Sequence, residues 1–282
     1  QPFRYHVSED ILTSIALHSD KTRDWRSVYH PRAECRMLSP RSVEAWSIQR
    51  LKYAGGTFDI MLRMNPVFRR GMKWRTKLHY AATFWPYLSV LWAPVLVSAP
   101  VIAFIFVVAP IAAPASDFFA HLLPALILNE LALMTSAKGH SLQKGRVMAL
   151  TLLPIQFRAL WSVLRGRRPQ FPTTPKTLGG RRIPLDRILP NVAVLGVMAG
   201  AAGVGIWSVA IGRTTHDLAL VLTNLLWLGW NGWGIGQILI AALWQRHLAL
   251  EGIADTSVLP AGNSSWTEKK ETNDELDDRH AA

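Results

Sequence analysis

The chain has a single cysteine, Cys35, among its 282 residues. No internal disulfide can therefore form, which fits a reducing, cytoplasmic environment. A signal peptide is also missing, because no basic segment followed by a short apolar core opens the chain. The sequence begins at Gln1 rather than Met, which predicts a processed or truncated piece. Acidic residues are scarce as well, 19 against 31 Lys and Arg.

The chain is both rich in hydrophobic residues and positively charged. Half of the residues are hydrophobic, and yet the net charge is +12. This combination is typical of a membrane protein with basic cytoplasmic loops. The charge is unevenly spread, since residues 251–282 hold 8 of the 19 acids and only 3 of the 31 bases. A basic body could attract nucleic acid, but the long apolar runs favour lipid headgroups or a phosphorylated substrate, and we expect no nucleic-acid partner.

Four runs have the length and apolarity to cross a bilayer, which takes about 20 residues. The segment between the second and third runs is long and rich in Lys and Arg, whereas the other two connections are short and carry one Arg between them. The positive-inside rule then places both termini and the long middle loop in the cytoplasm. The four predicted spans are Phe84–Ala109, Phe118–Ala137, Ile188–Ile211 and Leu218–Trp244.

Amphipathic segments flank these spans. The segment 39–65 has apolar residues at three- and four-residue spacing, with Ser39 as the expected cap and Asn65-Pro66 as the stop. Gly55-Gly56 in its interior predicts a kink or a close backbone approach. Residues 68–79 and 145–164 are further basic or amphipathic stretches, which we expect to lie at the membrane interface. Trp25–Tyr29 reads as a short strand.

Three stretches could carry chemistry. Ser8-Glu9-Asp10 stands at the expected start of a helix, where acidic side chains commonly stabilise the helix through its dipole. Asp10 could alternatively act as a general base. Gln49-Arg50-Leu51-Lys52-Tyr53 gathers an amide, two cations and an aromatic ring, which suits a phosphorylated sugar as well as a membrane surface. Lys176, in a proline-rich loop, could reach a phosphate or simply mark a cytoplasmic loop.

The order and spacing of these three motifs resemble the C-terminal part of a processive, membrane-embedded family 2 glycosyltransferase, the group that contains bacterial cellulose synthase catalytic subunits. The family's Thr-Glu-Asp is similar to Ser8-Glu9-Asp10, and its Gln-x-x-Arg-Trp is similar to Gln49–Tyr53. Its gating loop, Phe-x-Val-Thr-x-Lys, resembles Phe171-Pro172-Thr173-Thr174-Pro175-Lys176. The resemblance covers roughly residues 5–245. Lys52 and Tyr53 replace the family's Arg and Trp, which leaves the sugar and the linkage open.

The resemblance implies a site and a reaction. Asp10, with Glu9 beside it, would be catalytic, while Gln49, Arg50, Lys52 and Tyr53 would bind substrate. Phe171, Thr174 and Lys176 would close over a UDP-sugar, most plainly UDP-glucose, which is added to a growing β-linked polysaccharide. The family's Mg²⁺-binding Asp-x-Asp has no counterpart in this sequence, so we expect no metal ligand here and place the Mg²⁺ site before Gln1. The fragment alone should be inactive.

The polymer would leave through the spans, where a sugar chain needs aromatic faces and amide partners. Trp227, Trp230 and Asn231 in the fourth run could supply them, although an interfacial belt of Trp would have the same composition. Membrane lipid and accessory export subunits are the other expected partners.

Together these features predict a mainly α membrane protein that carries the end of a GT-A-type α/β catalytic domain. It would be an inner (plasma) membrane protein. The expected parts are a cytoplasmic domain end with an interface helix (1–66), an interface helix with the first pair of spans (67–137), a cytoplasmic helix with the gating loop (138–187), the second pair (188–245) and a disordered acidic tail (246–282). Two alternatives stay open: a non-catalytic transporter or assembly protein, and a synthase of another polymer such as β-1,3-glucan, chitin, hyaluronan or mannan.

Overall fold

The computed structural model describes residues 6–23, 25–28, 39–108, 115–137, 142–167, 182–212 and 218–250. These residues form helices and connecting segments, with no strand among them. The helices run in the order α1 (Glu9–Ser19), α2 (Val43–Arg63), η1 (Pro66–Phe68), α3 (Trp74–Phe84), η2 (Trp85–Leu88), α4 (Ser89–Phe106), α5 (Ala115–Ala137), α6 (Leu142–Leu164), α7 (Leu185–Ala210) and α8 (Leu218–Leu250).

Five helical segments are long and apolar enough to cross a membrane, namely Trp74–Phe106, Phe119–Ala137, Lys144–Leu164, Leu185–Ala210 and Leu218–Leu250. Four of these overlap the predicted spans, so the mainly helical fold, with helices of membrane-spanning length, is confirmed. The fifth, in α6, is the stretch that we expected at the interface. It qualifies because Arg158 is the one charged residue between Val147 and Leu164.

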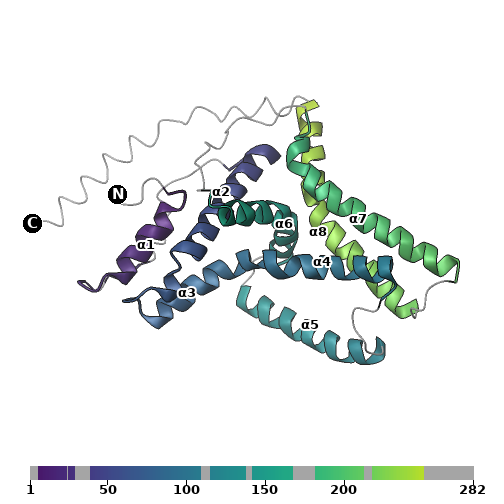
Figure 1. Ribbon diagram of the computed structural model, residues 1–282, viewed down its shortest axis with the longest axis horizontal. Coiled ribbons are helices and arrows are strands. Elements are labelled where there is room, and N and C mark those ends of the chain that lie inside the picture. The colour runs from purple at the N-terminus through teal and green to yellow at the C-terminus, as the bar shows by residue number, and fades with distance from the viewer. Residues whose placement is uncertain are drawn as a thin grey trace, which may run out of the picture.

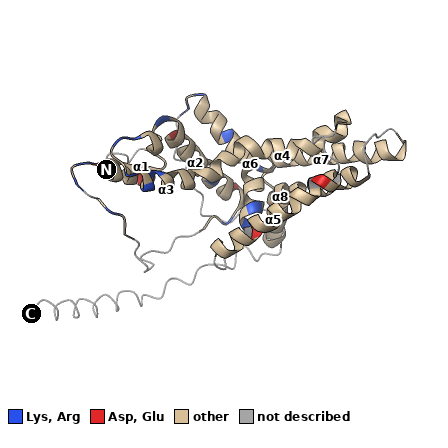
Figure 2. Cartoon of the chain, turned by 90° about the horizontal axis from the view of Figure 1, so that it is seen from below, with Lys and Arg blue, Asp and Glu red and all other residues tan. Residues whose placement is uncertain are grey.

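The helices divide into two regions. α1, α2 and α3 lie together at one end of the molecule, and α4, α7 and α8 extend toward the other (Figure 1). Acidic and basic residues gather around α1 to α3, whereas α4 and most of α7 are free of them (Figure 2). This separation of charged from apolar helices is typical of a protein with a water-exposed region joined to a membrane region.

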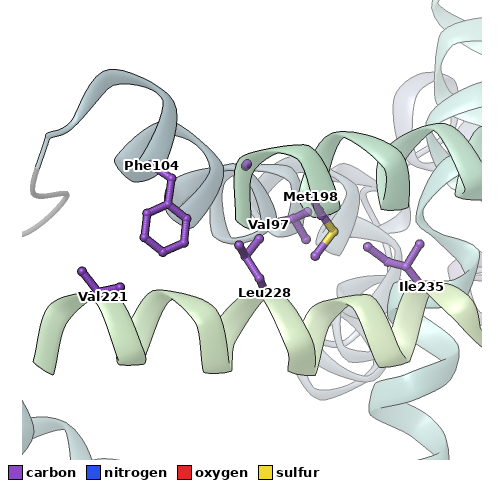
Figure 3. Packing of buried hydrophobic residues seen from close by; sticks show 7 residues of the cluster. Val97, Phe104, Met198, Val221, Leu228 and Ile235 are labelled. Carbon is purple, nitrogen blue, oxygen red and sulfur yellow. The ribbon is translucent and has the colours of Figure 1, made fainter. Parts of the chain in front are cut away.

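The membrane region has one continuous apolar core between α4, α7 and α8 (Figure 3). Small residues let these helices approach closely: the ring of Phe104 lies where a Cβ on Gly205 would be, with its nearest atom only 2.5 Å from that position. In lipid, such contact is a main source of helix association. The buried members of this core are Val97, Phe104, Met198, Ala201, Val221, Leu228 and Ile235.

α2 connects the two regions because its opposite faces are both buried. Ala54 and Phe58 pack against α6, in a cluster with Val90, Ala159 and Val163. Ile60, on the other side, packs with Leu12 and Ile15 of α1 and with Met72 and Phe84. The helix that carries the Gln49–Tyr53 motif is therefore held between α1 and α6.

Two local predictions were wrong. α2 begins three residues later than expected, because Ser42 rather than Ser39 is its cap and its side chain accepts a hydrogen bond from the Ala45 N–H at 3.1 Å. Residues 25–28 form no strand, since a strand needs a neighbour to pair with and the described residues offer none. The stop at Asn65-Pro66 was correct: Asn65 Oδ1 accepts from the Val67 N–H and opens the short helix η1.

Candidate functional site

The start of α1 lies directly against the middle of α2. Ser8, the residue before the acidic pair, is buried, and its Oγ lies only 2.2 Å from the place where a Cβ on Gly56 would be. Only a glycine at position 56 leaves room for this contact. The expected close backbone approach at Gly55-Gly56 is therefore confirmed, while α2 continues through both glycines as one helix.

This contact explains why Ser8 forms no side-chain cap. It occupies the cap position of α1, but its hydroxyl makes no capping hydrogen bond. Glu9 and Asp10 follow in the first turn, with both side chains exposed to solvent. Glu9 and Asp10 are therefore exposed at the surface, while Ser8, which precedes them, is buried against α2.

A buried charged group on α2 holds the same turn from the other side. The Ser8 N–H donates to Nδ1 of His6 at 3.0 Å, so the proton of the neutral ring is on Nε2. That nitrogen donates to Oδ2 of Asp59 at 3.0 Å. Arg63, one turn further along α2, approaches Oδ1 of Asp59 to 2.7 Å. Asp59 is only 4% exposed, so this network is largely shielded from water.

The far end of α1 is anchored separately. His18 lies within hydrogen-bond distance of Tyr80 Oη, at 3.0 Å, and of Ser27 Oγ, at 2.8 Å. The acidic pair is therefore fixed relative to α2 at one end of its helix and relative to α3 at the other.

The residues of the Gln49–Tyr53 motif do not all point the same way. Gln49, Lys52 and Gly56 follow one another at three- and four-residue spacing and so share the face of α2 that meets Ser8. Gln49 Nε2 donates a long hydrogen bond, 3.4 Å, to the hydroxyl of Tyr53, whose side chain is 43% exposed. Arg50 instead turns its guanidinium over the ring of Trp46, 5.9 Å from the ring centre. Gln49, Lys52 and Tyr53 thus lie on the side of α2 that meets Ser8 at Gly56, one to two turns before that contact, whereas Arg50 turns toward Trp46.

The predicted gating loop, with Phe171, Thr174 and Lys176, lies outside the described residues. The three predicted channel residues are described and differ in their surroundings. Asn231 is buried, with its Nδ2 unpaired among the described residues, while Trp230 is half exposed on the outside of α8 and Trp227 is partly buried.

Sequence reasoning missed the polar residues that join the helices. Nδ2 of Asn191 on α7 donates to the carbonyl oxygens of Thr151 on α6, at 3.2 Å, and of Ile235 on α8, at 3.1 Å. Thr151 Oγ1 bonds in turn to the carbonyl of Gly234 at 2.7 Å. Glu130 of α5 pairs with Arg146 of α6. Polar residues inside apolar helices were the available signal, since membrane-embedded polar groups need partners.

The arrangement does not form a metal centre in the described part of the chain, because no three His, Cys, Asp or Glu side chains come together there. What Glu9 and Asp10 can do is accept a proton at an exposed carboxylate. A search against protein-family models finds none that matches this chain.

Proposed function

We propose that this chain is the C-terminal part of a membrane-embedded processive β-glycosyltransferase that resembles cellulose synthase. The observation that carries the proposal is the packing of Ser8 on Gly56. It sets the start of α1, with the acidic pair Glu9-Asp10, against the same helix that carries Gln49–Tyr53 one to two turns earlier. The proposed reaction needs both motifs at one place, and this packing supports that proposal. The proposal that residues 1–66 are the end of a GT-A-type α/β catalytic domain rests on the same resemblance.

Asp10 acts as the general base in this proposal. The oxygen of the acceptor hydroxyl attacks the anomeric carbon of the donor sugar, its proton passes to the Asp10 carboxylate, and the bond from that carbon to the diphosphate breaks with its electron pair leaving on UDP. Asp10 suits the task because its carboxyl group is exposed to solvent in the first turn of α1, where an acceptor hydroxyl can reach it.

The α2 motif orients the two sugars. Tyr53 offers an exposed ring for stacking and Gln49 an amide for hydrogen bonds. Lys52, on the face that meets Ser8, is better placed than Arg50 to balance the charge of the leaving diphosphate, and Lys176 would assist it. Mg²⁺, when bound by residues outside this chain, would supply further charge stabilisation.

The proposed topology has four spans, with α2 and α6 at the cytoplasmic interface of the inner membrane. α6 shares a core with α2, and α2 carries five charged residues along its length: Glu44, Arg50, Lys52, Asp59 and Arg63. If α6 crossed the bilayer, α2 would have to lie beside it in lipid, and burying those charges would be costly. Both termini are then cytoplasmic.

The test is polymer synthesis by the complete gene product in inverted membrane vesicles supplied with radiolabelled UDP-glucose. Asp10→Asn should lower incorporation at least about 100-fold, as expected for loss of a general base. Thr13→Ala, in the same helix, should have little effect. Normal synthesis by Asp10→Asn, with normal insertion, would remove Asp10 from the mechanism.

The same assay separates the rival functions. Incorporation from UDP-N-acetylglucosamine, alone or together with UDP-glucuronate, or from GDP-mannose instead would change the product but keep the site. Absence of any polymer, together with no Asp-x-Asp after a strand in the sequence encoded before Gln1, would favour a transporter or assembly protein.

A further inference from the structure

A small pocket opens where α2, α6 and the start of α7 meet. Its walls include Ser47 and Leu51 of α2, Ile155 and Arg158 of α6, and Asp186 and Arg187 of α7. Ser47 and Leu51 belong to the face of α2 that turns toward α6, opposite the face that meets Ser8. The pocket is therefore separate from the site proposed for sugar transfer.

The pocket contains a buried polar group without a partner. Ser47 is 4% exposed, and its Oγ has no hydrogen-bond partner among the described residues. A buried hydroxyl is normally paired, because leaving it unpaired costs about 1–3 kcal/mol. An acceptor that entered the pocket would satisfy it.

The pocket walls carry a net positive charge, which favours an anionic ligand. They include two guanidinium groups, Arg158 and Arg187, and one carboxylate, Asp186. The Asp186 side chain is 70% exposed, and although its Oδ2 lies 2.9 Å from Nε of Arg187, that buried nitrogen has no hydrogen-bond partner among the described residues. Arg158 is exposed and has no ion pair with the described residues. The uncapped N-terminus of α7, after Pro184, adds the positive end of a helix dipole.

The surroundings indicate where the anion comes from. The pocket lies beside the first turn of a membrane-length helix, Leu185–Ala210, and its remaining walls are apolar, formed by Leu51, Ile155 and two prolines. Basic pockets between helices at the cytoplasmic boundary commonly hold the headgroups of anionic lipids. Arg158, Arg187 and the Ser47 hydroxyl would contact phosphate oxygens, while the apolar walls would face the glycerol and the upper acyl chain.

We propose that this pocket binds the phosphate group of an anionic phospholipid headgroup at the junction of α2, α6 and α7. The bound lipid would join the helix that carries Gln49–Tyr53 to the membrane helices. This inference depends on the pocket alone, and it holds whether or not the chain belongs to a glycosyltransferase.

The test measures lipid binding to the purified full chain in neutral detergent by native mass spectrometry, with phosphatidylglycerol and phosphatidylcholine as probes. Phosphatidylglycerol should bind preferentially, and Arg158→Gln should weaken its binding about tenfold, as expected for loss of a charge-assisted hydrogen bond. Arg165→Gln is the matched control, because Arg165 follows the same helix but lies over the ring of Trp161, 4.7 Å from the ring centre. It should bind lipid like the parent chain.

Two further arms make the result decisive. Ser47→Ala removes the unpaired hydroxyl without changing the charge, and it should also weaken phosphatidylglycerol binding. Millimolar inorganic phosphate should not displace the lipid. Equal losses in Arg158→Gln and Arg165→Gln, equal binding of the two lipids, or displacement by inorganic phosphate would each overturn the proposal.

Discussion

Nε2 of His6 lies 3.0 Å from Oδ2 of Asp59, so the residues just before the acidic pair are hydrogen-bonded to a buried carboxylate on α2. Because the Ser8 N–H donates to the other ring nitrogen, Nδ1, the neutral imidazole of His6 carries its proton on Nε2. One side chain thus fixes the backbone of the first turn of α1 relative to the helix that bears the second motif.

Asp59→Asn should destabilise the chain by about 1–3 kcal/mol, because the amide loses the ion pair with Arg63 and offers one acceptor oxygen where the carboxylate offers two. The measurement is thermal unfolding of the purified protein in detergent. Glu44→Gln, which removes an exposed acid at the start of the same helix, is the control and should change stability by a few tenths of a kcal/mol. Equal effects of the two substitutions would mean that the His6–Asp59 contact contributes nothing.

Gly56→Ala should separate α1 from α2, since the new Cβ would stand 2.2 Å from Ser8 Oγ. We expect a loss of about 1–3 kcal/mol by overpacking, and a loss of polymer synthesis if the proposed function holds. The added substitution Ser8→Ala should restore much of the stability, because the next nearest atom, Ser8 Cβ, is at 3.4 Å. Gly196→Ala in α7, where a Cβ would meet nothing within 4 Å, should be tolerated. Tolerance of both substitutions would contradict the close packing.

Asp20 provides a test of pH dependence outside the membrane region. Hydrogen bonds from the hydroxyl and N–H of Thr22 and from Trp25 Nε1 lower the pKa of its carboxyl group from 3.8 to about 2. The folded state therefore favours the ionised form, and the stabilisation is complete above about pH 4 and disappears as the pH falls toward 2. Trp25→Phe should raise the pKa, which a carbon-detected NMR titration of Asp20 would measure. An unchanged pKa would show that the indole hydrogen bond does not form.

Four spans with α6 at the interface place the two ends of the chain on the same side of the membrane, whereas five spans would place them on opposite sides. Epitope tags before Gln1 and after Ala282 should both be digested by protease in inverted vesicles and both be protected in spheroplasts. Opposite behaviour of the two tags would show that α6 crosses the bilayer.

Much of the helical architecture follows from local pattern. The apolar stretches around Val97, Met198 and Leu228 are long enough to determine their own secondary structure in lipid, so the four predicted spans each overlap an apolar helix. Local pattern does not decide between a span and an interface helix for α6, because Arg158 is the one charged residue between Val147 and Leu164.

What local pattern could not provide is the contact between distant residues. Ser39 and Ser42 are equally good caps by composition, and only packing decides that α2 begins after Ser42. The motifs at Glu9-Asp10 and Gln49–Tyr53 could be located by type, but nothing in the sequence indicates that His6 bonds to Asp59, 53 residues away. The orientation of Arg50 toward Trp46 likewise depends on which face of α2 meets α6.

The amide of Asn191 has a mechanical consequence. It bonds to backbone oxygens of both α6 and α8 and so links three helices, and because Asn191 is fully buried these bonds are shielded from water. Any channel that opens for a polysaccharide must therefore widen away from the Asn191 contact, while α6, α7 and α8 move together as one rigid body.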